Sequence, residues 1–152
     1  GYHFIHDAQY TLTVDAARIN YCEFDRTFEH VLLVLDYSVL QRRCMKSLQK
    51  VEKNIILKHE IGGTNLRDFR ISDDGARCVL GGGGGKKCFH VIDIENEEQI
   101  KVESQYLKSC YAPCFINGEN QYVALCGVNG RIEIWDLNTK ASIKTIQSDS
   151  KN

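Results

Sequence analysis

The sequence has almost no proline, with one in 152 residues, and it contains no run of about 18 apolar residues. Without such a run, it predicts no membrane-spanning helix. An excess of one charge is missing as well, because 19 basic residues stand against 20 acidic ones, for a formal net charge of -1. This balance argues against a protein that is held on nucleic acid mainly by neutralising phosphates.

A dense disulfide framework is also missing, because the seven cysteines are an odd number at irregular spacing. Most of them stand inside apolar stretches, where a free cysteine behaves as a small buried hydrophobe. Cys78 precedes Val79, for example, and Cys126 follows Leu125. We therefore expect an intracellular protein, cytoplasmic or nuclear, whose cysteines stay reduced.

What the sequence does contain is a repeat of about 45 residues. Phe24, Ile71 and Ile116 occupy matching positions in three segments. In each segment a strand pattern leads through a turn to an apolar second strand. In the later two segments, the turns at 72–75 and 117–120 are rich in Asp, Asn and Gly. This length and this order of features are typical of a four-stranded propeller blade.

The segment 129–137 carries the most specific local pattern. Asn129 and Gly130 both tolerate positive φ, which predicts a tight two-residue type I′ hairpin turn. The strand after the turn largely follows a period of two, as expected of a half-buried strand. The apolar positions are Ile132, Ile134 and Leu137, and the polar positions are Arg131 and Glu133.

This strand closes on Trp135-Asp136, and for that reason the segment resembles one repeat of the WD-repeat β-propeller family. The resemblance covers residues 66–147 well and 18–60 weakly. It implies an all-β fold of four-stranded antiparallel blades in a protein that binds other molecules rather than transforming them. The residues that would carry the blade signature, in a structural role, are Asn129, Gly130, Trp135, Asp136 and Asp93.

The chain 1–152 is therefore interpreted as a partial WD-repeat propeller, with about three blades in an incomplete ring. Propellers typically have four to eight blades. We expect the remaining blades to come from other parts of the same polypeptide or from a partner chain. The units are an N-terminal strand segment at 1–17, with an alternating strand at Gln9–Val14, a degenerate blade at 18–60, and blades at 65–105 and 108–148.

The stretch 38–53 of the first blade has two interpretations. Apolar residues at Leu40, Cys44, Leu48 and Val51 follow the spacing of a helix. The alternative is a third strand that ends near Met45, a polar turn and a fourth strand at 54–59. Because the repeat length leaves no room for a helix and two outer strands, we favour the strands.

The family resemblance fails at several positions of the hydrogen-bonded tetrad that many WD repeats carry. Trp135 is present, but the hairpin position of the tetrad has Asn129 rather than Asp, and the second-strand position has Cys126 rather than Ser or Thr. No His precedes Cys110, and the second blade ends its third strand on Ile92-Asp93. The resemblance is thus to a divergent member, in which apolar contacts hold the blades together.

The glycines Gly81–Gly85 before Lys86 invite comparison with a phosphate-binding loop. The motif G-x-x-x-x-G-K-[ST] would require a glycine where Leu80 stands and Ser or Thr where Lys87 stands. The following residues, Cys88–Asp93, have a strand pattern, whereas phosphate loops lead into a helix. We interpret the glycines as a hairpin between two strands.

No group of residues predicts a metal, a cofactor or catalysis. Cys110 and Cys114 have no second pair at a zinc-like spacing, and strand residues four apart are about 13 Å from each other. His3, His6 and Asp7 are interpreted as part of a polar terminal segment. We therefore expect a protein that is not an enzyme, with no cofactor and no metal.

One concentration of charge remains, formed by the basic residues Arg42, Arg43, Lys46, Lys50 and Lys53. It is either a solvated outer hairpin or a patch that binds a partner. The leading hypothesis is a non-catalytic protein–protein interaction scaffold, a propeller segment within an intracellular multiprotein complex. A nucleic-acid-associated propeller that binds through 42–53 is the first alternative, and a propeller-fold enzyme is the second.

Overall fold

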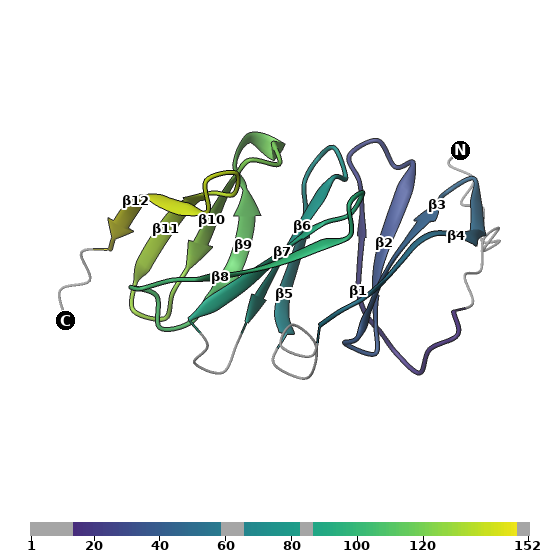
Figure 1. Ribbon diagram of the computed structural model, residues 1–152, viewed down its shortest axis with the longest axis horizontal. Coiled ribbons are helices and arrows are strands. Elements are labelled where there is room, and N and C mark those ends of the chain that lie inside the picture. Colours follow the sequence, from purple (N-terminus) through teal and green to yellow (C-terminus); the bar gives the residue numbers. More distant parts are fainter. Residues whose placement is uncertain (1–13, 59–65, 83–86, 149–152) are drawn as a thin grey trace, which may run out of the picture.

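The computed structural model describes residues 14–58, 66–82 and 87–148 (Figure 1). They form three four-stranded antiparallel sheets that stand side by side, and in each sheet the strands are hydrogen-bonded in the order of the sequence. Apart from a single 3₁₀ turn, η1 (Ile116–Gly118), the regular structure of these residues is all strand. The prediction of an all-β fold with four-stranded antiparallel blades is confirmed.

The three sheets, called blades 1 to 3, have these strands. Blade 1 contains β1 (Ile19–Phe24), β2 (His30–Leu35), β3 (Val39–Cys44) and β4 (Ser47–Ile56). Blade 2 contains β5 (Leu66–Ile71), β6 (Arg77–Gly82), β7 (Cys88–Asp93) and β8 (Glu98–Glu103). Blade 3 contains β9 (Tyr111–Phe115), β10 (Tyr122–Cys126), β11 (Arg131–Asp136) and β12 (Ala141–Gln147).

The stretch 38–53 forms strands, as we favoured, and not a helix. β3 and β4 pair along their length, with Leu40 opposite Ile55 and Cys44 opposite Ser47. The fourth strand begins at Ser47 rather than near residue 54, because the register shifts twice between Arg42 and Cys44. These irregularities let a ten-residue strand follow a six-residue one.

Apolar side chains of facing sheets make two cores, one between each pair of neighbouring blades. Leu32 and Val34 of blade 1 pack with Phe69, Leu80 and Ile92 of blade 2. The other face of blade 2 packs against blade 3 through Val79, Phe89, Val123, Leu125 and Trp135. The apolar second strands supply much of the buried surface, and seven of their residues are at most 1% exposed: Leu32, Leu33, Val34, Val79, Leu80, Val123 and Leu125.

The hairpin between β10 and β11 differs from the predicted type I′ turn. Gly127 donates its N–H to the Arg131 carbonyl at 2.8 Å, so the loop has three residues, 128–130. Gly130 has φ +68, whereas Asn129 is not among the residues with positive φ. A three-residue loop with glycine in the left-handed region at its end is the next most common hairpin connection, and it needs glycine at one position only.

Several expectations lie outside the described residues. They concern His3, His6 and Asp7, all but the last residue of the strand expected at Gln9–Val14, and the glycine-rich residues 83–86. The strands on either side of this glycine-rich stretch, β6 and β7, are paired neighbours, with Gly81 opposite Phe89. The expectation that Cys88–Asp93 is a strand is confirmed.

Candidate interaction surface

The tips of the hairpins at one edge of the sheets bond to one another across the blades. Asp73 of blade 2 accepts a hydrogen bond from the Arg26 side chain at 3.2 Å, and its N–H donates to the Gly118 carbonyl at 2.9 Å. Asn120 donates to the Asp74 carboxylate at 2.7 Å. We call this the hairpin row. Hydrogen bonds thus join the hairpin tips of three successive blades.

Two aspartates shape the hairpins from within. Asp25 accepts from the backbone N–H groups of Glu29 and His30 and contacts the His30 Nδ1 at 2.9 Å. Asp74 accepts from the Ser72 hydroxyl at 2.6 Å and from the Ala76 N–H at 3.0 Å. Burial alone would raise the pKa of each carboxyl, but these hydrogen bonds outweigh it and hold both pKa values below the ordinary range.

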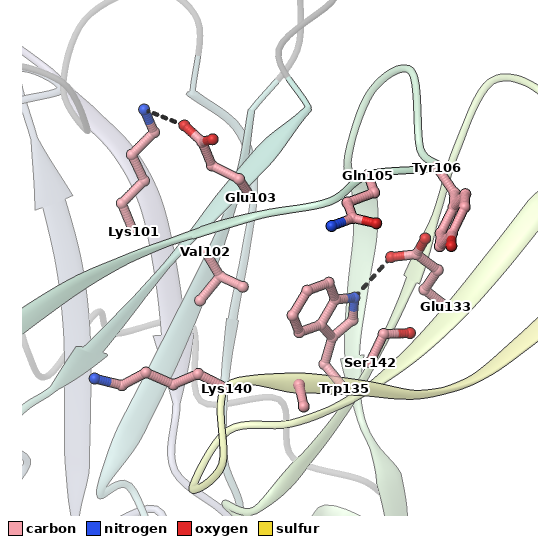
Figure 2. Close-up of a pocket in the computed structure, with 10 residues that line it drawn as sticks. Lys101, Val102, Glu103, Gln105, Tyr106, Glu133, Trp135, Lys140 and Ser142 are labelled. Carbon is pink, nitrogen blue, oxygen red and sulfur yellow. Dashed lines mark hydrogen bonds and ion pairs between the residues drawn. The ribbon is translucent and has the colours of Figure 1, made fainter.

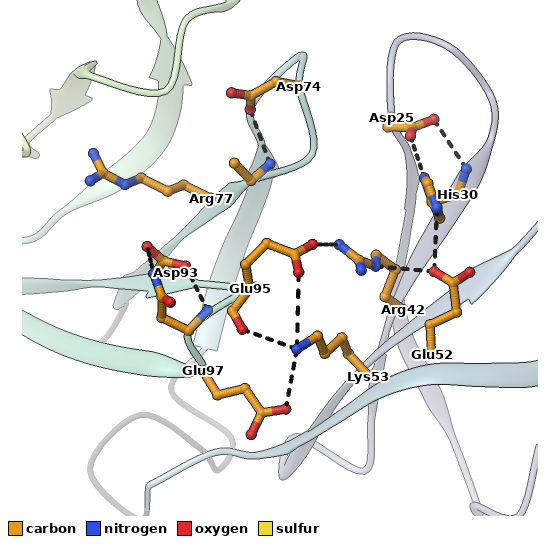
Figure 3. Close-up of polar contacts among 12 residues, drawn as sticks. Asp25, His30, Arg42, Glu52, Lys53, Asp74, Arg77, Asp93, Glu95 and Glu97 are labelled. Carbon is orange, nitrogen blue, oxygen red and sulfur yellow. Dashed lines mark hydrogen bonds and ion pairs between the residues drawn. The ribbon is translucent and has the colours of Figure 1, made fainter.

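Strands β3 and β4 of blade 1 meet the turn between β7 and β8 of blade 2 in a cluster of charges. We call this cluster the charged seam, and it consists of Arg42, Glu52, Lys53, Glu95 and Glu97 (Figure 3). Arg42 bonds to Glu95 of blade 2 and lies 3.3 Å from Glu52 of its own blade. Lys53 donates to the Glu95 carbonyl at 3.0 Å. The hydrogen bond from Arg42 lowers the pKa of Glu95. The seam joins two blades by ion pairs rather than by apolar contact alone.

The five basic residues singled out from the sequence do not gather on one surface. Arg42 and Lys53 belong to the charged seam, where carboxylates balance their charge. Arg43, the next residue along β3, is buried, and its guanidinium donates to the Leu48 carbonyl at 2.8 Å. Lys46 and Lys50 are exposed. Alternation along the strand separates Arg42 from Arg43, so the run of charges does not make one continuous patch.

The interface between blades 2 and 3 contains a buried polar network around Glu133. The Trp135 indole donates to Glu133 Oε2 at 2.8 Å, and the Ser104 hydroxyl donates to the same oxygen at 2.9 Å. Ser104 in turn accepts from the Leu107 N–H at 2.9 Å. Serine, glutamate and tryptophan thus link the end of one blade to the third strand of the next.

This network reverses the predicted faces of β11. Glu133 and Trp135 point toward blade 2 and are 0% and 7% exposed, whereas Ile132 and Ile134 lie on the other face and are partly exposed. The prediction that Glu133 faces solvent is wrong. The Trp135 ring packs edge-on against Phe89 at 5.5 Å, and the period of two then places Glu133 on the same buried face.

A pocket of about 520 Å³ opens between β8 of blade 2 and β11 and β12 of blade 3 (Figure 2). Trp135 and Glu133 line it, together with Val102 and Tyr106. Lys101 and Glu103, also in the lining, form an ion pair at 2.8 Å. We call this cavity the Trp135 pocket. It combines an indole, a buried carboxylate and exposed polar side chains.

The remaining signature residues have local structural contacts. Asp136 accepts from the Asn138 N–H at 2.9 Å, and Asp93 accepts from the Asn96 N–H at the same distance. Both residues therefore shape the turn between the third and fourth strands of a blade. Asn129 donates to the Tyr106 carbonyl at 3.0 Å.

Within the described ranges, no three His, Cys, Asp or Glu side chains are placed to hold a metal ion. Cys110 is buried and Cys114 is exposed. Burial, with added repulsion from Cys88 and Glu133, raises the pKa of the Cys110 thiol to about 12, so this thiol is unreactive. In the same part of the chain, no helix is long and apolar enough to cross a membrane.

Two solved structures share this arrangement of sheets. They are described as "Structure of U3-55K" and "Crystal structure of RRP9 WD40 repeats", and each has a TM-score of 0.66 at 10% sequence identity. Each alignment covers 87% of this chain, against 40% of the first structure and 39% of the second. The fold is that of WD-repeat propeller blades. At this identity the likeness concerns the fold alone, and the chain spans about two-fifths of those structures.

No family model matches the sequence, and no curated protein matches it. The propeller fold is therefore evident from the arrangement of strands and not from overall sequence similarity. In this chain the polar link of Trp135 runs through Glu133 to Ser104. The sequence signal for this network was Glu133, two residues before Trp135. It was not recognised, because a polar residue at every second position is ordinary in a strand.

Proposed function

We propose that this chain is a non-catalytic protein–protein interaction scaffold, a segment of a WD-repeat propeller in an intracellular multiprotein complex. The observation that supports it best is the row of three blades joined by hydrogen bonds, ion pairs and apolar cores. Such a frame holds loops and outer strands in fixed positions, so a partner can bind without the chain losing much conformational freedom. The likeness to WD-repeat structures adds support.

The open face of blade 3 supports the same proposal. On this face Ile132 and Ile134 are partly exposed, and Ile146, opposite Ile132 on β12, is 43% exposed. All seven residues of β12 are exposed. Contiguous apolar surface of this kind marks a contact site. We infer that another blade, from the same polypeptide or from a partner, packs there.

The nucleic-acid alternative has less support in the geometry. Its leading residues, Arg42 and Lys53, already pair with carboxylates, and Arg43 is buried. Lys46 and Lys50 are exposed and remain available to a partner. Reversal of these two lysines to glutamate therefore tests the alternative without breaking the charged seam.

The test of the scaffold proposal is affinity purification of the tagged full chain from cross-linked cells, with and without nuclease. We expect a stoichiometric set of proteins that survives nuclease, with cross-links that map to blade 3 and the hairpin row. The variant Lys46→Glu/Lys50→Glu should recover the same set. Loss of the partners after nuclease, or in this variant, would favour the nucleic-acid alternative.

Completeness of the ring has its own test. We expect the isolated chain to associate, or to need a partner, because its open blade face is apolar. Light scattering after size exclusion measures this directly. A monodisperse 17.3 kDa monomer that unfolds cooperatively without a partner would contradict the inference.

A further inference from the structure

The Trp135 pocket contains a charge whose hydrogen bonds are incomplete. Glu133 is fully buried, and both donors that it has, Trp135 and Ser104, bond to Oε2. Among the described residues, Oε1 has no hydrogen-bond partner. A buried carboxylate is stable only when paired or fully hydrogen-bonded, and Oε1, on a residue that lines the cavity, is an acceptor without a donor in the described part of the chain.

Of the four charged residues that line the pocket, Glu133 is the buried one. Lys101 and Glu103 pair with each other at 2.8 Å. Lys140 lies at the mouth and is exposed, so water screens its charge. No ion pair to Glu133 occurs in the described part of the chain. A cationic ligand would supply both the missing charge and the missing donor.

The aromatic lining selects among cations. The Trp135 indole and the Tyr106 ring are the aromatic groups of the lining. Tyr106 already makes a contact of this kind within the chain, since the Arg131 guanidinium lies 5.2 Å from the centre of its ring. A guanidinium stacks on aromatic rings and donates several hydrogen bonds in one plane, whereas an ammonium is a compact and strongly hydrated charge.

We propose that the Trp135 pocket binds an arginine side chain of a partner protein, with the guanidinium donating to Glu133 Oε1 and lying against the Trp135 indole. This proposal rests on the scaffold function and names the chemistry of the partner. Both walls belong to this chain, because the lining residues come from β8 and the residues after it and from β11, Lys140 and β12 (Figure 2). The pocket therefore exists whatever covers the outer face of blade 3.

Entry requires side chains at the rim to move, because Glu133 has no surface of its own in the unbound chain. Gln105, Lys140 and Ser142 line the pocket and are exposed. Exposed side chains of this kind change rotamer readily on binding. Shortening one of them should make Glu133 easier to reach.

The test uses the indole N–H of Trp135, which gives a single signal because the chain has one tryptophan. The full chain, labelled with ¹⁵N, is titrated with N-acetyl-arginine methylamide, and the probe's neutral isostere, the citrulline derivative, is the control. We expect a saturable shift of the indole signal with arginine and at least about tenfold weaker binding of citrulline. The lysine derivative should also bind more weakly.

Three variants complete the design. Glu133→Gln keeps an acceptor for Trp135 and Ser104 and should weaken arginine binding at least about tenfold. Lys140→Ala removes a positive charge, which repels arginine, and a side chain that covers the pocket. It should tighten arginine binding several-fold. Ala141→Phe fills the mouth without touching Glu133 and should abolish binding. If Glu133→Gln does not fold, the other two variants still decide the matter.

No saturable shift in either the unmodified chain or Lys140→Ala would overturn the proposal. Equal binding of citrulline, tighter binding of lysine, or unchanged binding in a folded Glu133→Gln would also overturn it. The probe needs no protein partner. If the arginine probe does not bind, the scaffold proposal is unaffected. If the probe binds but purification recovers no protein partner, the arginine site is supported and the scaffold proposal is not.

Discussion

Replacement of Gly118 by alanine tests whether the hairpin row stabilises the protein. Gly118 has φ +73, and a Cβ there would overlap the carboxylate of Asp73 in the neighbouring blade. Gly75 offers a matched control because its φ is +70, while the nearest atom to its Cβ, in Asp25, is 3.6 Å away. Both substitutions bear the strain of a left-handed residue, about 1–2 kcal/mol. Only the first also displaces a side chain between blades.

The extra loss at Gly118 follows from what Asp73 must give up. Turning its side chain away from a preferred rotamer costs about 0.5–1.5 kcal/mol. Its ion pair with Arg26 is exposed and adds at most about 1 kcal/mol. Gly118→Ala should therefore lower the free energy of unfolding by about 0.5–2.5 kcal/mol more than Gly75→Ala does.

Urea denaturation of the full chain, followed by the fluorescence of Trp135, measures both variants. The double variant Asp73→Ala/Gly118→Ala removes the overlap, so in that background the Gly118 substitution should cost no more than Gly75→Ala. Equal losses in the two single variants would refute the reasoning. Failure of Asp73→Ala to relieve the difference would refute it as well.

Three other changes have definite expected outcomes. Phe89→Ala removes a buried ring that packs on Trp135, so it should lower the free energy of unfolding by about 3–5 kcal/mol. Urea denaturation measures this, and a loss below about 1 kcal/mol would contradict the packing. Because the pKa of Asp25 is lower in the folded chain than in the unfolded one, its contribution to stability is present at neutral pH and is lost as the pH falls through the folded value. Asp25→Asn should flatten this acid limb in a series of urea titrations between neutral and acid pH, and an unchanged limb would contradict the assignment. Glu95→Gln removes the charge that pairs with Arg42, but this carboxylate is 58% exposed. The free energy of unfolding should therefore fall by at most about 0.5–1 kcal/mol at low salt and by less at high salt. A loss that does not depend on salt would contradict a role through charge.

The strands could be predicted because their signals are local and repeated. The apolar runs at 30–35, 77–82 and 122–126 stand at the blade spacing, and each became the second strand of a sheet. The stretch 38–53 was ambiguous, because strand irregularities near Arg43 can imitate helical spacing over a few residues. There the length of the repeat, rather than the pattern itself, decided correctly.

The candidate site could not be predicted in the same way. Glu133 was predicted on the polar face of its strand, and alternation alone does not say which face of a strand packs against the neighbouring sheet. Its partner Ser104 is 29 positions away in sequence and carries no motif. The basic run at Arg42 was visible, but carboxylates contributed by the turn after β7 balance it, and only tertiary structure brings these groups together.

Each blade is one continuous stretch of chain whose successive strands are hydrogen-bonded neighbours. Ordering a blade therefore closes only short loops, which makes this step fast compared with pairing distant strands. Because each blade contacts mainly its neighbours in the sequence, the blades should unfold as a short linear array. The stability of such an array is the sum of one free energy for each blade and one for each junction between blades. Opening should start at β12, whose seven residues are all exposed, and amide exchange should slow progressively from there toward β10 and then β6. A pull on the C-terminus would accordingly peel blade 3 away before it disturbs the junction between blades 1 and 2.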